Sequence, residues 1–98
     1  MANETSKENT VFIGKKPVMN YVVACLTFFN AGEEEVMVKA RGRAISTAVD
    51  TVELLKRAFI KNLEVKKIEI GTEEITDVDS QKRNVSIIEI TVIKAGSE

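Results

Sequence analysis

Histidine is absent from this 98-residue chain, and cysteine and proline occur once each. The single cysteine, Cys25, excludes an intrachain disulfide and cannot form a thiolate metal cluster by itself. The absence of histidine also excludes most familiar zinc sites and every His-dependent catalytic triad within one chain. No nucleophile and base can be paired, so we expect no enzyme, no metal and no cofactor.

Long apolar runs are also lacking. None approaches the length of a membrane-spanning helix, so we expect no membrane contact. The start, "MANETSKENT", has neither the apolar stretch of a secretory signal nor the arginine-rich pattern of a transit peptide. These features predict a cytoplasmic protein with a disordered tail at residues 1–9 and a single domain over residues 10–95.

Strand and helix patterns alternate along the first half of the chain. The apolar run "TVFI" predicts a short buried strand, and Gly14 and Pro17 mark its end and the start of a helix. Apolar residues from Val18 to Phe29 recur at helical spacing, and "NAG" provides a stop. A second strand is expected at about residues 36–40, followed by a helix with an apolar stripe from Ile45 to Phe59 that ends near Asn62.

Two long alternating segments fill the second half. Residues 65–76 and 84–94 alternate apolar and polar side chains as half-buried strands do, and "DVDSQKR" between them predicts a turn. The predicted fold is therefore an α/β two-layer sandwich with the order β-α-β-α-β-β, a mixed four-stranded sheet and two helices on one face. The last hairpin should overhang the body, because twelve strand residues extend roughly 40 Å whereas each helix spans roughly 20 Å.

This order predicts that three loops meet at one end of the molecule: residues 14–17, 41–43 and 77–83. Lys15 and Lys16 would stand at the start of the first helix, and Arg41 and Arg43 before the second, where helix N-termini already favour anions. Gly42 would permit a close approach to phosphate or a positive φ. The four cations predict a phosphate-binding surface, although the formal net charge is −1.

Structural interpretations remain open for the same residues. Paired cations in loops are usually only solvated, and Tyr21 either contacts a phosphate at this end or is an aromatic at the edge of the core. Lys82 and Arg83 at the hairpin turn could be surface charges that only prevent the strand edges from aggregating. Phe59 is either a core residue or an exposed apolar side chain that promotes association.

The segments "IGKKPVMNYV" and "VKARGRAISTAVDTVELLKRAF" resemble the Alba family, the Sac10b-like archaeal chromatin proteins. The resemblance extends from Val11 to Lys94. It implies a fold similar to the C-terminal domain of bacterial translation initiation factor three. It also implies a chromosome-associated homodimer whose long hairpins flank a basic body and bind double-stranded DNA with little sequence preference.

The same resemblance assigns roles to individual residues. Lys15, Lys16, Arg41 and Arg43 match the family's cations that contact the nucleic-acid backbone, and Tyr21 matches its tyrosine near the phosphates.

The resemblance also covers the arm and the surface of the family fold. Lys82 and Arg83 match basic residues of arms that reach into the minor groove, and Phe59 matches the contact between neighbouring dimers. Lysine acetylation in the G-K-K loop is a family theme, which implies an acetylase and a deacetylase acting on Lys15 or Lys16.

Several departures from the family pattern predict reduced affinity for duplex DNA. The chain carries one more acid than base, Asp77 and Asp79 lie near the hairpin turn, and Thr47 stands where a lysine is often seen. The alternative is therefore an RNA-binding protein, or a subunit of an RNA–protein complex, that uses the same surface. A third hypothesis, of a different class, is a protein-interaction module in which the long strands and Phe59 mediate assembly.

Overall fold

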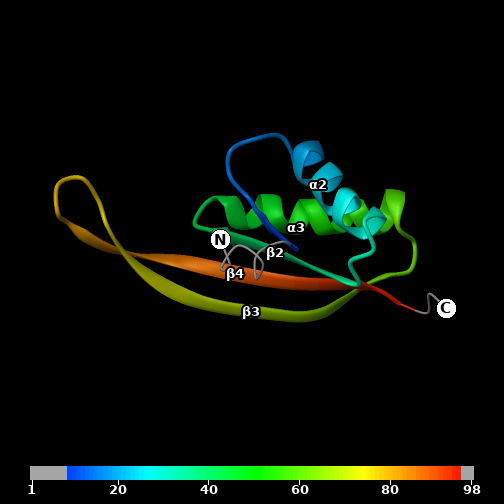
Figure 1. Ribbon diagram of the computed structural model, residues 1–98. Helices are drawn as coiled ribbons and strands as arrows, with labels where there is room; N and C mark the ends of the chain where they lie inside the picture. Colours follow the sequence, from blue (N-terminus) through cyan, green and yellow to red (C-terminus); the bar gives the residue numbers. More distant parts are fainter. Residues whose placement is uncertain (1–8, 96–98) are drawn as a thin grey trace.

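Both helices lie on one face of a mixed four-stranded sheet, and a long hairpin extends beyond them (Figure 1). The computed structural model describes residues 9–95. The elements follow the predicted order: β1 (Thr10–Phe12), α2 (Val18–Asn30), β2 (Glu35–Arg41), α3 (Ala44–Leu54), the π-helical turn η1 (Leu55–Phe59), β3 (Leu63–Thr76) and β4 (Lys82–Lys94). The predicted tail lies outside the described residues except for Asn9, whose side-chain amide donates to the carbonyl of Glu35 at 3.2 Å.

The order of the strands across the sheet is β1-β2-β4-β3, so β4 lies between β2 and β3. β1 and β2 pair in parallel, whereas the β2–β4 and β3–β4 pairs are antiparallel. The β2–β4 pairing reaches Arg41 opposite Ile87, and beyond this point β3 continues to pair with β4. Residues 72–86 therefore form the overhanging hairpin, called the arm below, which is visible on the left of Figure 1.

The core lies between the sheet and the helices. Val36, Val38 and Ala40 alternate along β2 with more exposed residues and are buried against the helices. Their partners on β4, including Ile90 and Val92, share this face. From α2, the predicted stripe supplies three buried side chains (Val22, Cys25 and Phe29), joined by Tyr21. The strand period of two and the helix period of 3.6 thus converge on one core.

The second helix differs from its prediction. Its buried residues are Ala48, Thr51, Val52 and, in η1, Leu55. Phe59 of the predicted stripe is 45% exposed, and the helical segment ends there instead of near Asn62, because Ile60 has extended backbone angles. The buried hydroxyl of Thr51 donates to the carbonyl of Thr47 at 2.8 Å, which makes the burial of this polar side chain tolerable.

Two strand predictions also need correction. Phe12 was expected to be buried, but it is 54% exposed, since alternation along β1 turns Val11 and Ile13 into the core and Phe12 to the opposite face. β3 was expected to be half-buried, yet most of its residues are exposed, because neither helix covers this edge of the sheet. In the described part of the chain, no helix is long and apolar enough to cross a membrane.

Candidate nucleic-acid interface

Two cationic loops lie at the same end of the molecule. Since β1 and β2 run in parallel, with Val11 opposite Val38, the C-terminal ends of both strands lie at the same end of the sheet. The loop after β1 carries Lys15 and Lys16, and β2 leads into Arg41, Gly42 and Arg43; all four cationic side chains are exposed. β3 also runs in this direction, and the arm projects from the same end (Figure 1).

Tyr21 binds the backbone of the first loop, between β1 and α2, from the core. Its hydroxyl oxygen accepts hydrogen bonds from the backbone N–H groups of Gly14 and Lys16, both at 2.9 Å. The side chain is only 7% exposed and belongs to the core. This placement matches the interpretation of Tyr21 as an aromatic at the edge of the core. It also means that these two loop N–H groups are directed at the phenol, a contact that sequence spacing did not predict.

Gly42 adopts a positive φ of 59° in the turn between β2 and α3. Its N–H donates to the carbonyl of Ser86 at 2.8 Å, and its carbonyl accepts from the N–H of Ile45 at 3.1 Å. The glycine therefore serves the turn geometry, the second of its two predicted uses, and its N–H is bonded to β4. The bond to Ser86 attaches the R-G-R loop to the base of the arm, and the bond from Ile45 closes the turn into α3.

Arg41 has an anionic partner that the sequence analysis missed. Its Nη1 atom lies 2.9 Å from Oε1 of Glu73, and both side chains are about half exposed. The two residues come from β2 and β3, separated by β4. The signal that would have found this pair is the strand register, which the sequence alone does not specify.

The arm ends in a turn held by Asp77. One oxygen of its carboxylate accepts hydrogen bonds from the N–H groups of Asp79 and Gln81, at 3.0 and 3.1 Å. This acidic residue thus caps the turn as well as adding negative charge. Lys82 and Arg83 follow at the start of β4 and are exposed, opposite Thr76 and Ile75 of β3.

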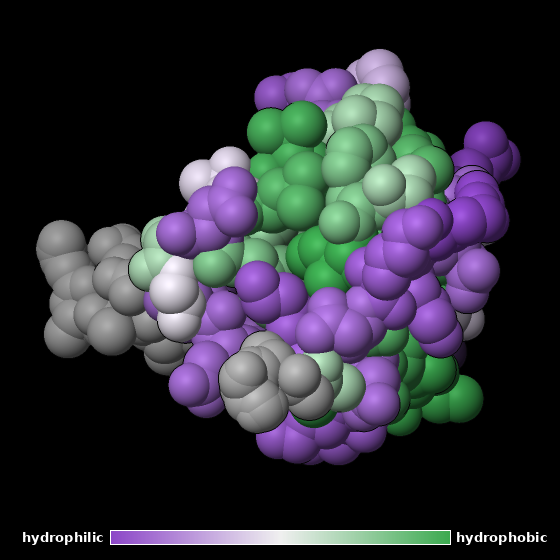
Figure 2. All heavy atoms as spheres, turned by 90° about the vertical axis from the view of Figure 1, so that its right-hand side faces the viewer, coloured by the Kyte–Doolittle hydropathy of each residue, from purple (hydrophilic) through white to green (hydrophobic). Residues whose placement is uncertain are grey.

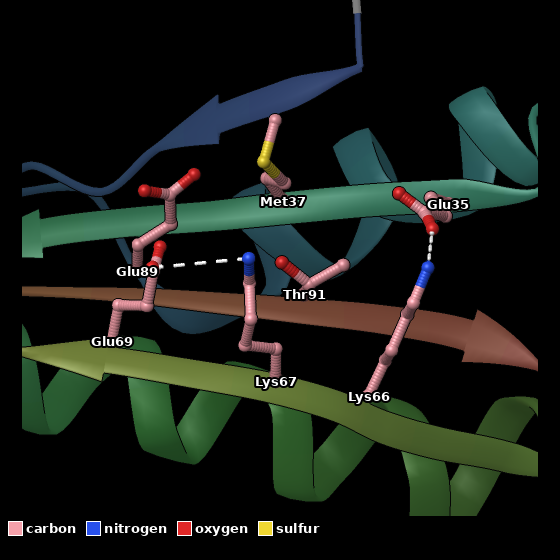
Figure 3. A pocket seen from close by; sticks show the side chains of 7 residues that line it. All are labelled: Glu35, Met37, Lys66, Lys67, Glu69, Glu89 and Thr91. Atoms are coloured by element: carbon pink, nitrogen blue, oxygen red, sulfur yellow. Dashed lines mark hydrogen bonds and ion pairs between the residues drawn. The ribbon is translucent and has the colours of Figure 1, made fainter.

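The sheet face that points away from the helices carries charges of both signs (Figure 3). Lys66 forms an ion pair with Glu35, and Nζ of Lys67 lies 3.8 Å from Oε2 of Glu69. Glu89 also lies on this face, around a shallow hollow that includes Met37 and Thr91. Within residues 9–95, no group of three or more acidic, cysteine or histidine side chains could hold a metal ion. Mixed charges make this face less suited to a polyanion than the lysine and arginine loops.

An exposed apolar face lies along α3 and β3. It consists of Val49, Ile68 and Ile70, which are 42%, 57% and 80% exposed, together with the half-buried Ile45 and Ile88. Ile45, Ile70 and Ile88 line a shallow groove there. Figure 2, which views the molecule from the end opposite the arm, shows that apolar residues also reach the surface over the helical layer. Phe59 is a further exposed aromatic, at the end of η1.

Comparisons with known proteins agree on one relationship. A family model described as Alba matches residues 9–72. The chain is 52% identical over 84 residues to "DNA/RNA-binding protein Alba" of Methanocella arvoryzae, covering 86% of this chain and 88% of the relative. It is 55% identical over 87 residues to "DNA/RNA-binding protein Alba 1" of Archaeoglobus fulgidus, covering 89% and 97%.

Two solved structures are similar over most of the chain. Alba from Thermoplasma volcanium superimposes with a TM-score of 0.82 at 42% identity, covering 87% of this chain and 99% of that protein. ALBA1 from Trypanosoma brucei gives a TM-score of 0.73 at 34% identity, covering 91% of this chain and 71% of the other.

Proposed function

The chain belongs to the Alba family, as its two motifs predicted, and we propose that it is a homodimer that binds duplex DNA through the backbone phosphates. The observation that carries this proposal is the parallel pairing of β1 and β2, which brings Lys15, Lys16, Arg41 and Arg43 to the end from which the arm projects. The names of the curated relatives support it, and they describe nucleic-acid-binding proteins rather than enzymes, in agreement with the prediction that the chain is not an enzyme.

The proposed contacts are electrostatic and carry little sequence information. The four cations of the body bind phosphates, while Lys82 and Arg83 of each arm extend toward the minor groove. A dimer presents twice this set. If about four to eight phosphates are engaged, the slope of log K against log salt is roughly −4 to −7.

Affinity should be lower than in more basic members of the family. The formal net charge is −1, and Asp77 and Asp79 lie in the arm turn. Their carboxylates repel the phosphates on either side of the groove that the arm enters. We therefore propose binding at moderate salt and a chromosome-associated location in an archaeal cytoplasm, without a role as the bulk packaging protein.

The apolar face supports the homodimer. Ile68 and Ile70 are exposed on the helix side of β3, beside α3, where a polyanion offers no apolar complement. A second copy places the same aliphatic face against this one, which satisfies both copies by twofold symmetry. The second copy would also stabilise the arm, since a two-stranded ribbon buries little surface by itself.

Two surface features support further parts of the proposal. Phe59 is exposed at the end of η1, where it can contact a neighbouring dimer on the same duplex. Lys15 and Lys16 are exposed and therefore accessible to an acetylase and a deacetylase. Acetylation removes one charge and with it one phosphate contact.

A salt titration with a matched control tests the main proposal. Binding of Lys15→Ala/Lys16→Ala to random-sequence duplex is compared with that of Lys56→Ala/Lys61→Ala, which removes two exposed lysines near the opposite end of the sheet. The first variant should bind more weakly at every sequence and show a shallower slope, by up to about 3.6 for a dimer that loses four phosphate contacts. Equal losses in the two variants would contradict the assignment.

RNA is the alternative target, favoured by the double designation "DNA/RNA-binding" of the relatives and by the acidic balance of this chain. The same loops would bind an RNA backbone, since both polymers present phosphates. Competition between a folded RNA and random duplex DNA at one salt concentration separates the two targets. Preferential retention of the RNA would favour a subunit of an RNA–protein complex.

A further inference from the structure

Arg41 already has an anion bound in the free protein. The 2.9 Å contact between its Nη1 and Oε1 of Glu73 engages one nitrogen of the guanidinium that the proposed function assigns to a phosphate. The other three body cations (Lys15, Lys16 and Arg43) make no ion pair within residues 9–95. Among the four, Arg41 is thus the one cation that is already paired with an anion, so a phosphate must compete with Glu73 for its Nη1.

The strand register explains why these two residues meet. Arg41 lies opposite Ile87 on β4, and Ile87 lies opposite Gly71 on β3, so the three residues form one row across the sheet. Gly71 carries no side chain, and Glu73 is the next residue of β3 on the same face. The arginine therefore reaches across β4 to the base of the arm.

We propose that Glu73 is a built-in competitor of the nucleic-acid backbone for Arg41. This inference rests on the proposed function and assigns to Glu73 the lowering of affinity at that same site. A carboxylate and a phosphate offer the planar guanidinium similar hydrogen-bond acceptors, so one can replace the other. Because the pair is exposed, it is weak enough for a polyanion to displace, and the displacement reduces the observed affinity.

The adjacent Glu74 provides a matched control. It lies one residue further along β3, so its side chain points to the opposite face, and it makes no ion pair in the described part of the chain. Glu73→Gln and Glu74→Gln therefore change the net charge equally and at nearly the same place. A general electrostatic effect makes both variants bind more tightly by the same factor, whereas competition affects Glu73→Gln alone.

The experiment measures affinity for random-sequence duplex at low salt, for both variants and for wild type, each with Arg41 intact and with Arg41→Gln. With Arg41 intact, Glu73→Gln should bind about two- to five-fold more tightly than Glu74→Gln, the range expected for the loss of an exposed ion pair. With Arg41→Gln, the two glutamine variants should bind equally. This cycle isolates the coupling between Arg41 and Glu73.

Other outcomes overturn the inference in distinguishable ways. Equal tightening by both variants with Arg41 intact means that Glu73 acts only through net charge. Weaker binding by Glu73→Gln means that the carboxylate holds Arg41 in its binding position. Absence of binding by the wild type would instead contradict the proposed function itself.

Discussion

The hydroxyl oxygen of Tyr21 accepts a hydrogen bond from the backbone N–H of Lys16 at 2.9 Å. A core side chain thereby fixes the backbone of a residue whose own side chain is exposed to solvent. The same oxygen accepts from the N–H of Gly14, so the loop between β1 and α2 is held at two points. We interpret Tyr21 as a residue that positions the lysines.

Tyr21→Phe tests this interpretation because it keeps the ring and removes only the acceptor. The Gly14 and Lys16 N–H groups lose their partner in a partly buried site, so the variant should be less stable by about 1 kcal/mol. Binding to DNA should weaken only modestly, with an unchanged salt slope, since no cation is lost. Denaturant unfolding and a salt titration measure the two quantities. Unchanged stability with a large loss of binding would instead identify the hydroxyl as a direct phosphate contact.

Gly42→Ala should destabilise the turn between β2 and α3. At φ +59° an alanine is strained, and its Cβ would also lie 3.4 Å from Cγ1 of Val85. We expect a loss of about 1 kcal/mol in the free energy of unfolding. Gly71→Ala is the control, because a Cβ there meets only ordinary contacts at 3.6 Å. Urea midpoints at constant m-value report both effects, and an equal shift in the two variants would contradict the turn argument.

Much of the fold was predictable because each element depends on local signals. Pro17 and the spacing from Val18 to Phe29 marked α2, and alternation marked β3 and β4. The chain order then determined that the G-K-K and R-G-R loops share an end. The family, read from two motifs, was confirmed by the comparisons.

The failures concern information that local sequence does not contain. On α3, apolar residues occur both on the buried side, with Val52, and on the exposed face, with Val49, so one apolar stripe could not separate the two. The bond from Lys16 to Tyr21 and the Arg41–Glu73 pair depend on loop conformation and strand register. Roles in nucleic-acid binding for the individual residues stay predictions.

Cys25 predicts a pH dependence of stability. Burial raises the pKa of its thiol from 9.0 to about 12, because the thiolate would be desolvated. Above pH 9 the unfolded chain loses this proton while the folded chain retains it, so the free energy of unfolding falls as pH rises toward 12. The contribution approaches about 1.4 kcal/mol per pH unit. Cys25→Ala should show a shallower decline over pH 9–10.5 in denaturant unfolding, and identical declines would contradict the shift.

Phe59→Ala tests the proposed contact between neighbouring dimers. The ring is 45% exposed, so its removal should cost little stability and leave the affinity of one dimer for a short duplex unchanged. On a long duplex, binding should become less cooperative, because neighbours lose an apolar contact. Isotherms on short and long duplexes measure this difference. If the variant already bound the short duplex more weakly, Phe59 would have a role other than the contact between neighbouring dimers.

Ile70→Glu tests the homodimer without disturbing the subunit. Ile70 is 80% exposed in the single chain, so a carboxylate there meets water and the fold should be retained. In the proposed dimer the same position lies within the apolar interface, where two symmetry-related charges are desolvated and repel each other, so the variant should be monomeric. Val78→Glu is the control, since Val78 is 99% exposed in the arm turn, outside the apolar face. Sedimentation equilibrium of both variants and the wild type decides the question. A dimeric Ile70→Glu variant would move the interface elsewhere, whereas a monomeric wild type would refute the dimer.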